Sequence, residues 1–273
     1  MKSFRVTSLF ILAVILSLSV SKRFASAASE KDELKMKMFA NEGRPAVVNL
    51  EHELLEKLDP LGRVVGAFKP NAKLATDDTI YIKLHNAQVS VGDKFLIYND
   101  LGGIKMPGSF FKKVGHNILY KGVIQITSVL PETVVAKIIE SWLDIEMNDS
   151  LTTYRDLQVT INPKEPVVEK YGHILGSPKG LELIGPFELA YIDLGSRDGL
   201  RKDDRLFAFM TGDGRREIVK GLPEVNTAEM VIVSLGEKFS TVYVLSANDR
   251  MESGNAIKTA IPLVKFLDDQ PAK

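Results

Sequence analysis

The feature that most constrains the fold of this chain is an internal repeat. Residues 189–209 (LAYIDLGSRDGLRKDDRLFAF) have the pattern strand, turn, strand, and residues 79–98 (TIYIKLHNAQVSVGDKFLIY) have the same pattern. In the later copy Ala190, Ile192 and Leu194 alternate with polar or aromatic neighbours, the period of a half-buried strand. The chain is therefore predicted to contain two copies of one strand-rich module.

The spacing between the two copies is nearly constant along the chain. Gly62 aligns with Gly172 at an offset of 110 (172 minus 62), and Gly92 with Asp203 at 111 (203 minus 92). We align residues 123–126 with 230–233 and 135–138 with 242–245 at an offset of 107 (230 minus 123), and 148–151 with 254–257 at 106 (254 minus 148). A period this long predicts two tandem domains and not a solenoid.

The strand density sets the fold class. Short predicted strands separated by turn residues favour small antiparallel barrels. We expect an all-β protein with two tandem small antiparallel β-barrel modules and a short N-terminal helix within residues 47–58, where Leu50, Leu54 and Leu58 have helical spacing. The expected order is a signal peptide at 1–27, a tether and short helix at 28–60, module 1 at 61–161, a linker at 162–166, module 2 at 167–263 and a tail at 264–273.

The N-terminus has the three parts of a secretory signal. Lys2 and Arg5 precede an apolar run at residues 6–20, and Ala25 and Ala27 form an A-x-A cleavage site. The apolar run of about fifteen residues is shorter than the roughly twenty needed to span a bilayer. This pattern predicts a periplasmic protein with a cleaved signal, and the alternative is an inner-membrane protein anchored by an uncleaved signal.

Composition excludes several function classes. The 273 residues have a formal net charge of zero, which does not support nucleic-acid binding. The chain has no cysteine, so disulfides, cysteine metal sites, a thiol nucleophile and a lipid-anchor cysteine are all absent.

No catalytic motif is found in the sequence. A G-x-S-x-G elbow, a Walker loop, a dinucleotide fingerprint and an H-E-x-x-H motif are all missing, and after His52 and Glu53 the second histidine position holds Glu56. We therefore expect no enzymatic activity, no cofactor and no metal. The alternative is an envelope hydrolase or glycan-modifying enzyme that uses paired carboxylates such as Asp203 and Asp204.

Two long connections are the candidate partner-binding elements. Residues 102–117 and 210–226 occupy corresponding places in the two copies and carry aromatic and basic side chains, types that favour partner binding. An alternative is that the phenylalanines cover a barrel end and that the charges only keep a loop solvated. The candidate partner-binding residues are Phe110, Phe111, Lys112, Lys113, Trp142, Arg215, Arg216 and Lys220.

The second copy also carries a family resemblance. The order GHILGSPKG, AYIDLGSRDGLRKDDRLFAF, AEMVIVSLGEKFSTVYVLS and MESGNAI resembles the small β-barrel domain that follows LysM repeats in bacterial envelope peptidoglycan-binding proteins. It is also similar to the C-terminal domain of flagellar assembly protein T. The resemblance covers residues 62–151 and 172–257, and the sequence departs from it at Asp203, where glycine is usual, and at Asn255, where aspartate is usual.

The resemblance implies a fold and an envelope location, and because no LysM domain is present it does not extend to peptidoglycan binding. We expect a non-enzymatic periplasmic interaction or scaffold protein of the bacterial cell envelope. Its expected partners are an envelope protein of a flagellar or secretion assembly, or peptidoglycan, with self-association as a further option and membrane contact only if the signal is retained.

Overall fold

The described chain is built from β-strands. The computed structural model describes residues 46–69, 73–85, 88–109, 111–211 and 224–259, and within them the only helical element is the short 3-10 turn η1 (Ser196–Asp198). No helix in this part of the chain is long and apolar enough to cross a membrane. The predicted signal peptide and the predicted tail at 264–273 lie outside the described residues.

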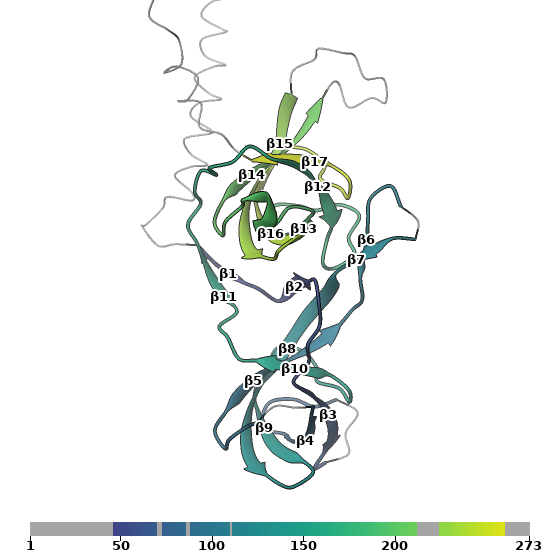
Figure 1. The fold of residues 1–273 in the computed structure, drawn as a ribbon, viewed down its shortest axis with the longest axis vertical. Helices are drawn as coiled ribbons and strands as arrows, with labels where there is room; N and C mark the ends of the chain where they lie inside the picture. The colour runs from purple at the N-terminus through teal and green to yellow at the C-terminus, as the bar shows by residue number, and fades with distance from the viewer. Residues whose placement is uncertain (1–45, 70–72, 86–87, 110, 212–223, 260–273) are drawn as a thin grey trace, which may run out of the picture. The chain divides into compact units, whose positions relative to one another are not determined.

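Most strands of the described chain belong to two six-stranded antiparallel barrels (Figure 1). In barrel 1 the closed order is β8-β5-β10-β3-β4-β9, and β2 (His52–Leu55) adds to β8. In barrel 2 it is β12-β13-β16-β15-β14-β17, closed by β12 and β17. The strands of barrel 1 are β3 (Gly62–Ala67), β4 (Thr79–Leu84), β5 (Lys94–Asp100), β8 (His116–Val129), β9 (Val134–Ser141) and β10 (Ser150–Thr153). Those of barrel 2 are β12 (Tyr171–Gly176), β13 (Leu189–Ile192), β14 (Arg205–Thr211), β15 (Glu224–Leu235), β16 (Ser240–Ala247) and β17 (Ala256–Thr259).

The two barrels have the same topology, which confirms the repeat. Strands β3, β4, β5, β8, β9 and β10 have the same neighbours as β12, β13, β14, β15, β16 and β17. The β3–β4 and β12–β13 pairs even share a register shift at equivalent places, between Val64 and Gly66 and between Ile174 and Gly176. The prediction of two tandem antiparallel barrels is therefore confirmed.

One predicted alignment was wrong by a residue. Ile124 pairs with Ile138 in barrel 1 and Met230 pairs with Val244 in barrel 2, so the offset of these strands is 106 (230 minus 124) and not 107. A one-residue slip moves every side chain to the opposite face of a strand. The predicted offset matched the core residue Ile124 with Val231, which belongs to a cluster outside the barrel 2 core.

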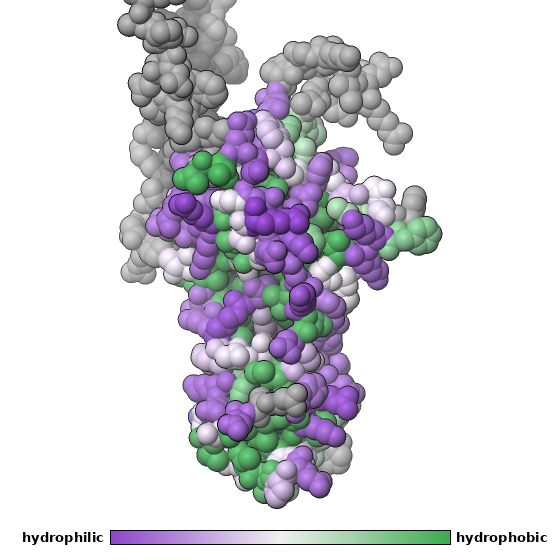
Figure 2. Space-filling view, in the orientation of Figure 1, coloured by the Kyte–Doolittle hydropathy of each residue, from purple (hydrophilic) through white to green (hydrophobic). Residues whose placement is uncertain are grey.

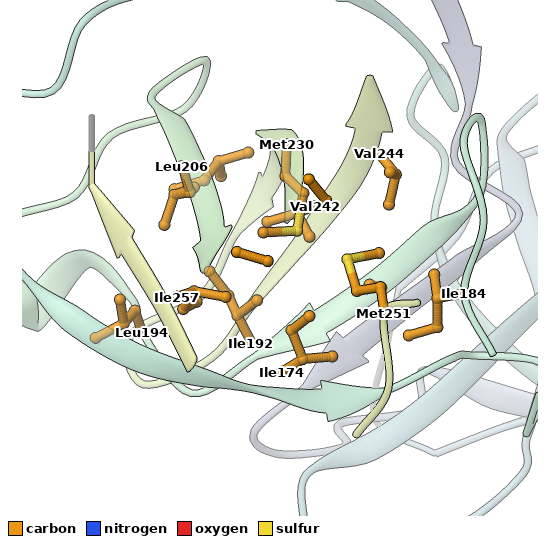
Figure 3. Packing of buried hydrophobic residues seen from close by; sticks show 14 of the residues in the cluster. Ile174, Ile184, Ile192, Leu194, Leu206, Met230, Val242, Val244, Met251 and Ile257 are labelled. Atoms are coloured by element: carbon orange, nitrogen blue, oxygen red, sulfur yellow. The ribbon is translucent and has the colours of Figure 1, made fainter. Parts of the chain in front are cut away.

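Each barrel encloses its own apolar core. In barrel 2, Ile174, Ile192, Leu206, Met230 and Val242 point into the barrel interior (Figure 3). In barrel 1 the equivalent positions hold Val64, Ile82, Phe95, Ile124 and Ala136. Burying aliphatic side chains of this size contributes about 1.5–3 kcal/mol each relative to leaving them exposed.

The prediction of an N-terminal helix at residues 47–58 was wrong. The structure has two strands there, β1 (Ala46–Asn49) and β2. Val48 and Leu50 are buried and Val47 and Asn49 exposed, so the period at this point is two and not 3.6. In β2, His52, Glu53 and Leu54 are all buried because tertiary contacts cover both faces. The leucine spacing matched a helix only because two strands with different environments follow one another.

Strand β1 precedes barrel 1 in the chain and β11 (Gln158–Ile161) follows it. The two strands pair with each other, and both contact barrel 2 (Figure 1). Val48, Leu50, Val159 and Ile161 form a buried cluster with Val231, Val233 and Leu245 from the outer side of β15 and β16. The predicted linker follows directly, and Lys164 within it pairs with the Asp204 region of barrel 2. We call the region where β1, β2 and β11 meet barrel 2 the junction.

Candidate partner-binding surface

The predicted loop at residues 102–117 is a β-hairpin. Its strands β6 (Ile104–Lys105) and β7 (Lys113–Val114) pair Ile104 with Val114 and Lys105 with Lys113. The hairpin projects at the right of the view (Figure 1), and in Figure 2 hydrophobic atoms at this place lie beside hydrophilic ones.

The base of this hairpin packs into the junction. Ile104 and Val114 contact a buried cluster of Leu54, Leu175 and Tyr191, which come from β2 and barrel 2. The alternative that the phenylalanines of this loop cover a barrel end is wrong for Phe111, which is 97% exposed, and Phe110 lies outside the described residues.

The tip of the hairpin has a defined turn. The Met106 N–H donates to the carbonyl of Lys112 at 2.9 Å, and the Ser109 N–H donates to the carbonyl of Met106 at 3.1 Å. The Lys112 N–H donates to the Ser109 hydroxyl at 3.2 Å. Phe111 is 97% exposed, and the neighbouring Lys112 and Lys113 are also exposed. The turn therefore holds an apolar ring and two cations outward.

Trp142 lies elsewhere. It follows the end of β9, is 42% exposed, and donates its backbone N–H to the carbonyl of Lys121. Along the extended strand β8, His116 and Lys121 are five residues and roughly 17 Å apart. The structure therefore does not join Trp142 and Phe111 into one patch. Four further predicted residues lie outside the described residues: Phe110, Arg215, Arg216 and Lys220.

The sequence did not single out the polar groups buried at the junction. Glu53 is 7% exposed and accepts hydrogen bonds from the Tyr120 hydroxyl at 2.8 Å, from Arg155 and from the Ser234 hydroxyl of barrel 2. Burial, and then the neighbouring Glu53 carboxylate, raises the pKa of Tyr120. One carboxylate thus joins three elements that are far apart in the sequence.

A second buried group centres on Asn117. Its side chain accepts a hydrogen bond from the Tyr191 hydroxyl at 2.7 Å and donates one to the carbonyl of Pro178 at 2.8 Å. His52 Nδ1 lies 3.4 Å from the same side-chain oxygen, and burial lowers the pKa of His52. Burial also raises the pKa of Tyr191. The sequence signal for the Glu53 group is that the two copies differ at Tyr120, whose counterpart at the offset of 106 is Asn226.

Several turns between strands share one hydrogen bond, and this bond explains why aspartates such as Asp93 and Asp204 occur at the turns. A side-chain oxygen accepts the backbone N–H of the residue three positions earlier, as Asp93 does from Ser90 and Asp204 from Arg201, both at 2.8 Å. The same contact occurs at Asp78, Asp149, Glu188 and Asn255, which makes six turns, and it also occurs at Asp198 within the 3-10 turn η1, which is not counted among the six. In all six turns the residue before the acceptor has a positive φ. This explains why glycine suits the position that Asp203 occupies.

Asp203 and Asp204, the carboxylates of the alternative hydrolase, both take part in local structure. Asp204 is 3% exposed, and burial raises its pKa while its bond from the Arg201 N–H opposes the shift. Asp203 lies 3.4 Å from the Lys164 ammonium. No observation in the structure favours a hydrolytic role for this pair. His52 and Glu53 lie on a strand, and no group of three or more histidine or acidic side chains in the described ranges is arranged to hold a metal ion.

The comparisons with known proteins name no relative. No family model matches the chain, and no curated protein is similar to it.

Proposed function

We propose that the protein is a non-enzymatic interaction or scaffold protein of the bacterial cell envelope, which acts in the periplasm after secretion. The β6–β7 hairpin is its principal contact element. The observation that carries the proposal is the near-complete exposure of Phe111 on a turn with its own hydrogen bonds. Phenylalanine is among the residue types that are enriched at the core of protein interfaces.

The surroundings of Phe111 favour an anionic partner. Lys112 and Lys113 adjoin it, and Lys105 pairs across the hairpin with Lys113. Clustered cations on a chain of zero net charge raise the local concentration of anionic partners. Envelope proteins with acidic surfaces and the carboxylates of peptidoglycan both fit. Because the hairpin base packs into the junction, the tip is presented by a rigid support.

The test begins with protein recovered from the periplasmic fraction, where N-terminal sequencing is expected to give Ala28 as the first residue. This protein, immobilised, is exposed to envelope extract with and without purified peptidoglycan sacculi. Phe111→Ser is expected to lower the affinity for the recovered partner about thirtyfold, the typical effect of truncating an aromatic hot spot. Lys112→Ser with Lys113→Ser is expected to weaken the salt dependence of binding.

Phe68→Ser is the matched control, because Phe68 is 71% exposed and lies after β3, away from the hairpin. It is expected to bind like the unaltered protein. Equal recovery with Phe111→Ser would move the contact surface elsewhere, and an intact Met1 in the membrane fraction would overturn the periplasmic proposal.

A further inference from the structure

A cavity of about 260 Å³ opens at the junction, apart from the β6–β7 hairpin. Its lining includes Val47 and Asn49 of β1 and, from the barrel 2 side of the chain, Lys179, Phe187 and Tyr243. Its lining thus combines backbone of a strand, two aromatic rings and a cation. Binding sites in proteins are typically concave and combine apolar side chains with a few polar groups.

Phe187 is an exceptional residue in the wall of this cavity. It occupies the positive-φ position of one of the six turns described above, with φ 68°. The other five turns hold Asp77, Gly92, Asn148, Asp203 and Gly254 there, types that tolerate this backbone. A bulky aromatic residue is disfavoured in the left-handed region, and Phe187 does not gain burial in return, because it is 63% exposed.

The ring of Phe187 nevertheless has a fixed neighbour. It lies 6.4 Å from the ring of Tyr243 at an interplanar angle of 44°. The two rings, with Leu181 (44% exposed) beside them, give the cavity an apolar wall. The residue at position 187 therefore weakens the turn and shapes the cavity.

The strand β1 contributes hydrogen-bonding backbone to the same cavity. In its sheet β1 pairs with β11, and the Leu50 N–H donates to the carbonyl of Leu157 at 2.8 Å. Backbone groups of successive strand residues point to opposite edges, so Val48 shares the direction of Leu50 while Val47 and Asn49 point away from β11. Outside the β1–β11 pairing, no hydrogen bond in the described part of the chain involves the backbone of Val47 or Asn49. An unpaired strand edge accepts an added strand.

His52 also lines the cavity. It is 5% exposed, its Nδ1 lies near Asn117, and its Nε2 makes no hydrogen bond to any described residue. A buried imidazole with one unused nitrogen supplies a polar contact without a net charge. Lys179 lines the cavity together with the acidic side chains of Glu51 and Glu188, and the Glu188 carboxylate accepts the N–H of Gly185 at 2.8 Å.

We propose that this cavity binds an extended peptide segment of a partner protein. The peptide adds as a strand to the edge of β1, and one of its apolar side chains packs against Phe187 and Tyr243. In this mode of recognition the main-chain hydrogen bonds provide affinity and the side-chain pocket provides selectivity. This proposal explains why Phe187 is kept at a position where it lowers the stability of its own turn, because its exposed ring binds the peptide.

The test uses the purified full chain and a phage library of random heptapeptides. Enriched sequences are expected to share one large apolar residue, and synthetic copies are measured by calorimetry. Phe187→Asn is expected to weaken their binding at least tenfold, while its melting temperature stays equal or rises, because asparagine tolerates a positive φ. Methylation of alternate peptide nitrogens is expected to weaken binding to the same degree.

Two control variants separate this site from other surfaces. Phe68→Asn removes an equally exposed phenylalanine, and Phe111→Ser removes the hairpin ring. Both are expected to bind the peptides like the unaltered chain. The proposal is overturned if no peptide is enriched, if Phe187→Asn binds them equally, or if Phe187→Asn melts earlier. It is likewise overturned if chitohexaose binds at the cavity in place of any peptide.

Discussion

At the scale of single residues, the repeat allows each barrel to serve as a reference for the other. Lys121 and Asp149 form an ion pair at 2.9 Å inside barrel 1, with side chains 7% and 3% exposed. The corresponding residues of barrel 2, at the offset of 106, are Thr227 and Asn255. Asn255 keeps the turn contact that Asp149 makes, by accepting the N–H of Glu252 at 2.7 Å. The same turn therefore forms both with a buried ion pair, as in barrel 1, and with neutral residues at the two positions, as in barrel 2.

We predict that removing one partner of the Lys121–Asp149 ion pair lowers the free energy of unfolding more than replacing both partners does. Asp149→Asn keeps the turn contact but leaves the Lys121 ammonium buried, with only Glu146 at 3.4 Å, and is expected to lower the free energy of unfolding by about 3 kcal/mol. Lys121→Thr with Asp149→Asn reproduces the barrel 2 residues and is expected to recover most of that loss. Urea unfolding of the single and double variants measures both, and a double variant no more stable than Asp149→Asn would contradict the prediction.

At the scale of elements, two glycines with positive φ flank the β6–β7 hairpin. Gly102 (φ 90°) precedes it and Gly115 (φ 58°) follows it. A Cβ at Gly102 meets nothing within 4 Å, whereas a Cβ at Gly115 lies 2.7 Å from Leu54 Cδ1 and 3.0 Å from the carbonyl of Leu55. Both positions need the left-handed backbone, and only Gly115 also needs the close approach to β2.

Alanine at these two positions is expected to separate the two effects. Gly102→Ala has only the backbone penalty and is predicted to destabilise the protein by about 1 kcal/mol. Gly115→Ala adds a steric clash with β2 and is predicted to cost about 1–3 kcal/mol more. Thermal unfolding gives the comparison. Equal losses would show that the hairpin base moves away from Leu54 at no cost.

At the scale of the whole described molecule, buried polar groups at the junction hold β2 and the start of β8 against barrel 2. Glu53 binds Ser234, and Asn117 binds both Tyr191 and the carbonyl of Pro178. A buried polar network of this kind is stable only when its members are paired. His52 belongs to it and has a lowered pKa, first because of burial, with the hydrogen bond to the Asn117 side-chain oxygen and the Glu51 charge opposing the shift.

His52 is expected to make stability fall in mild acid. Its usual pKa is 6.5, and the folded state holds a lower one. Below pH 6.5 the unfolded chain therefore binds a proton at His52 that the folded chain excludes. The free energy of unfolding decreases as pH falls, by at most about 1.4 kcal/mol per pH unit. The decrease ends where the pH reaches the pKa of His52 in the folded state. Urea unfolding between pH 5 and 7.5 is expected to show a smaller slope for His52→Gln. His85→Gln, at an exposed histidine, is the control and should retain the slope.

Local sequence patterns determined the barrels, because strand alternation and turn residues are properties of neighbouring residues. The Ile192 strand, the Asp93 and Asp204 turns and the order of the two copies could all be predicted from them. They could not fix the register of β15 to one residue, since Val231 and Met230 are both apolar and only the cluster around Val48 decides which faces inward. They also misassigned residues 47–58, where burial on both sides of β2 overrides the local period. The junction with its cavity brings His52, Phe187 and Tyr243 together across more than a hundred residues, and only tertiary packing decides such a contact.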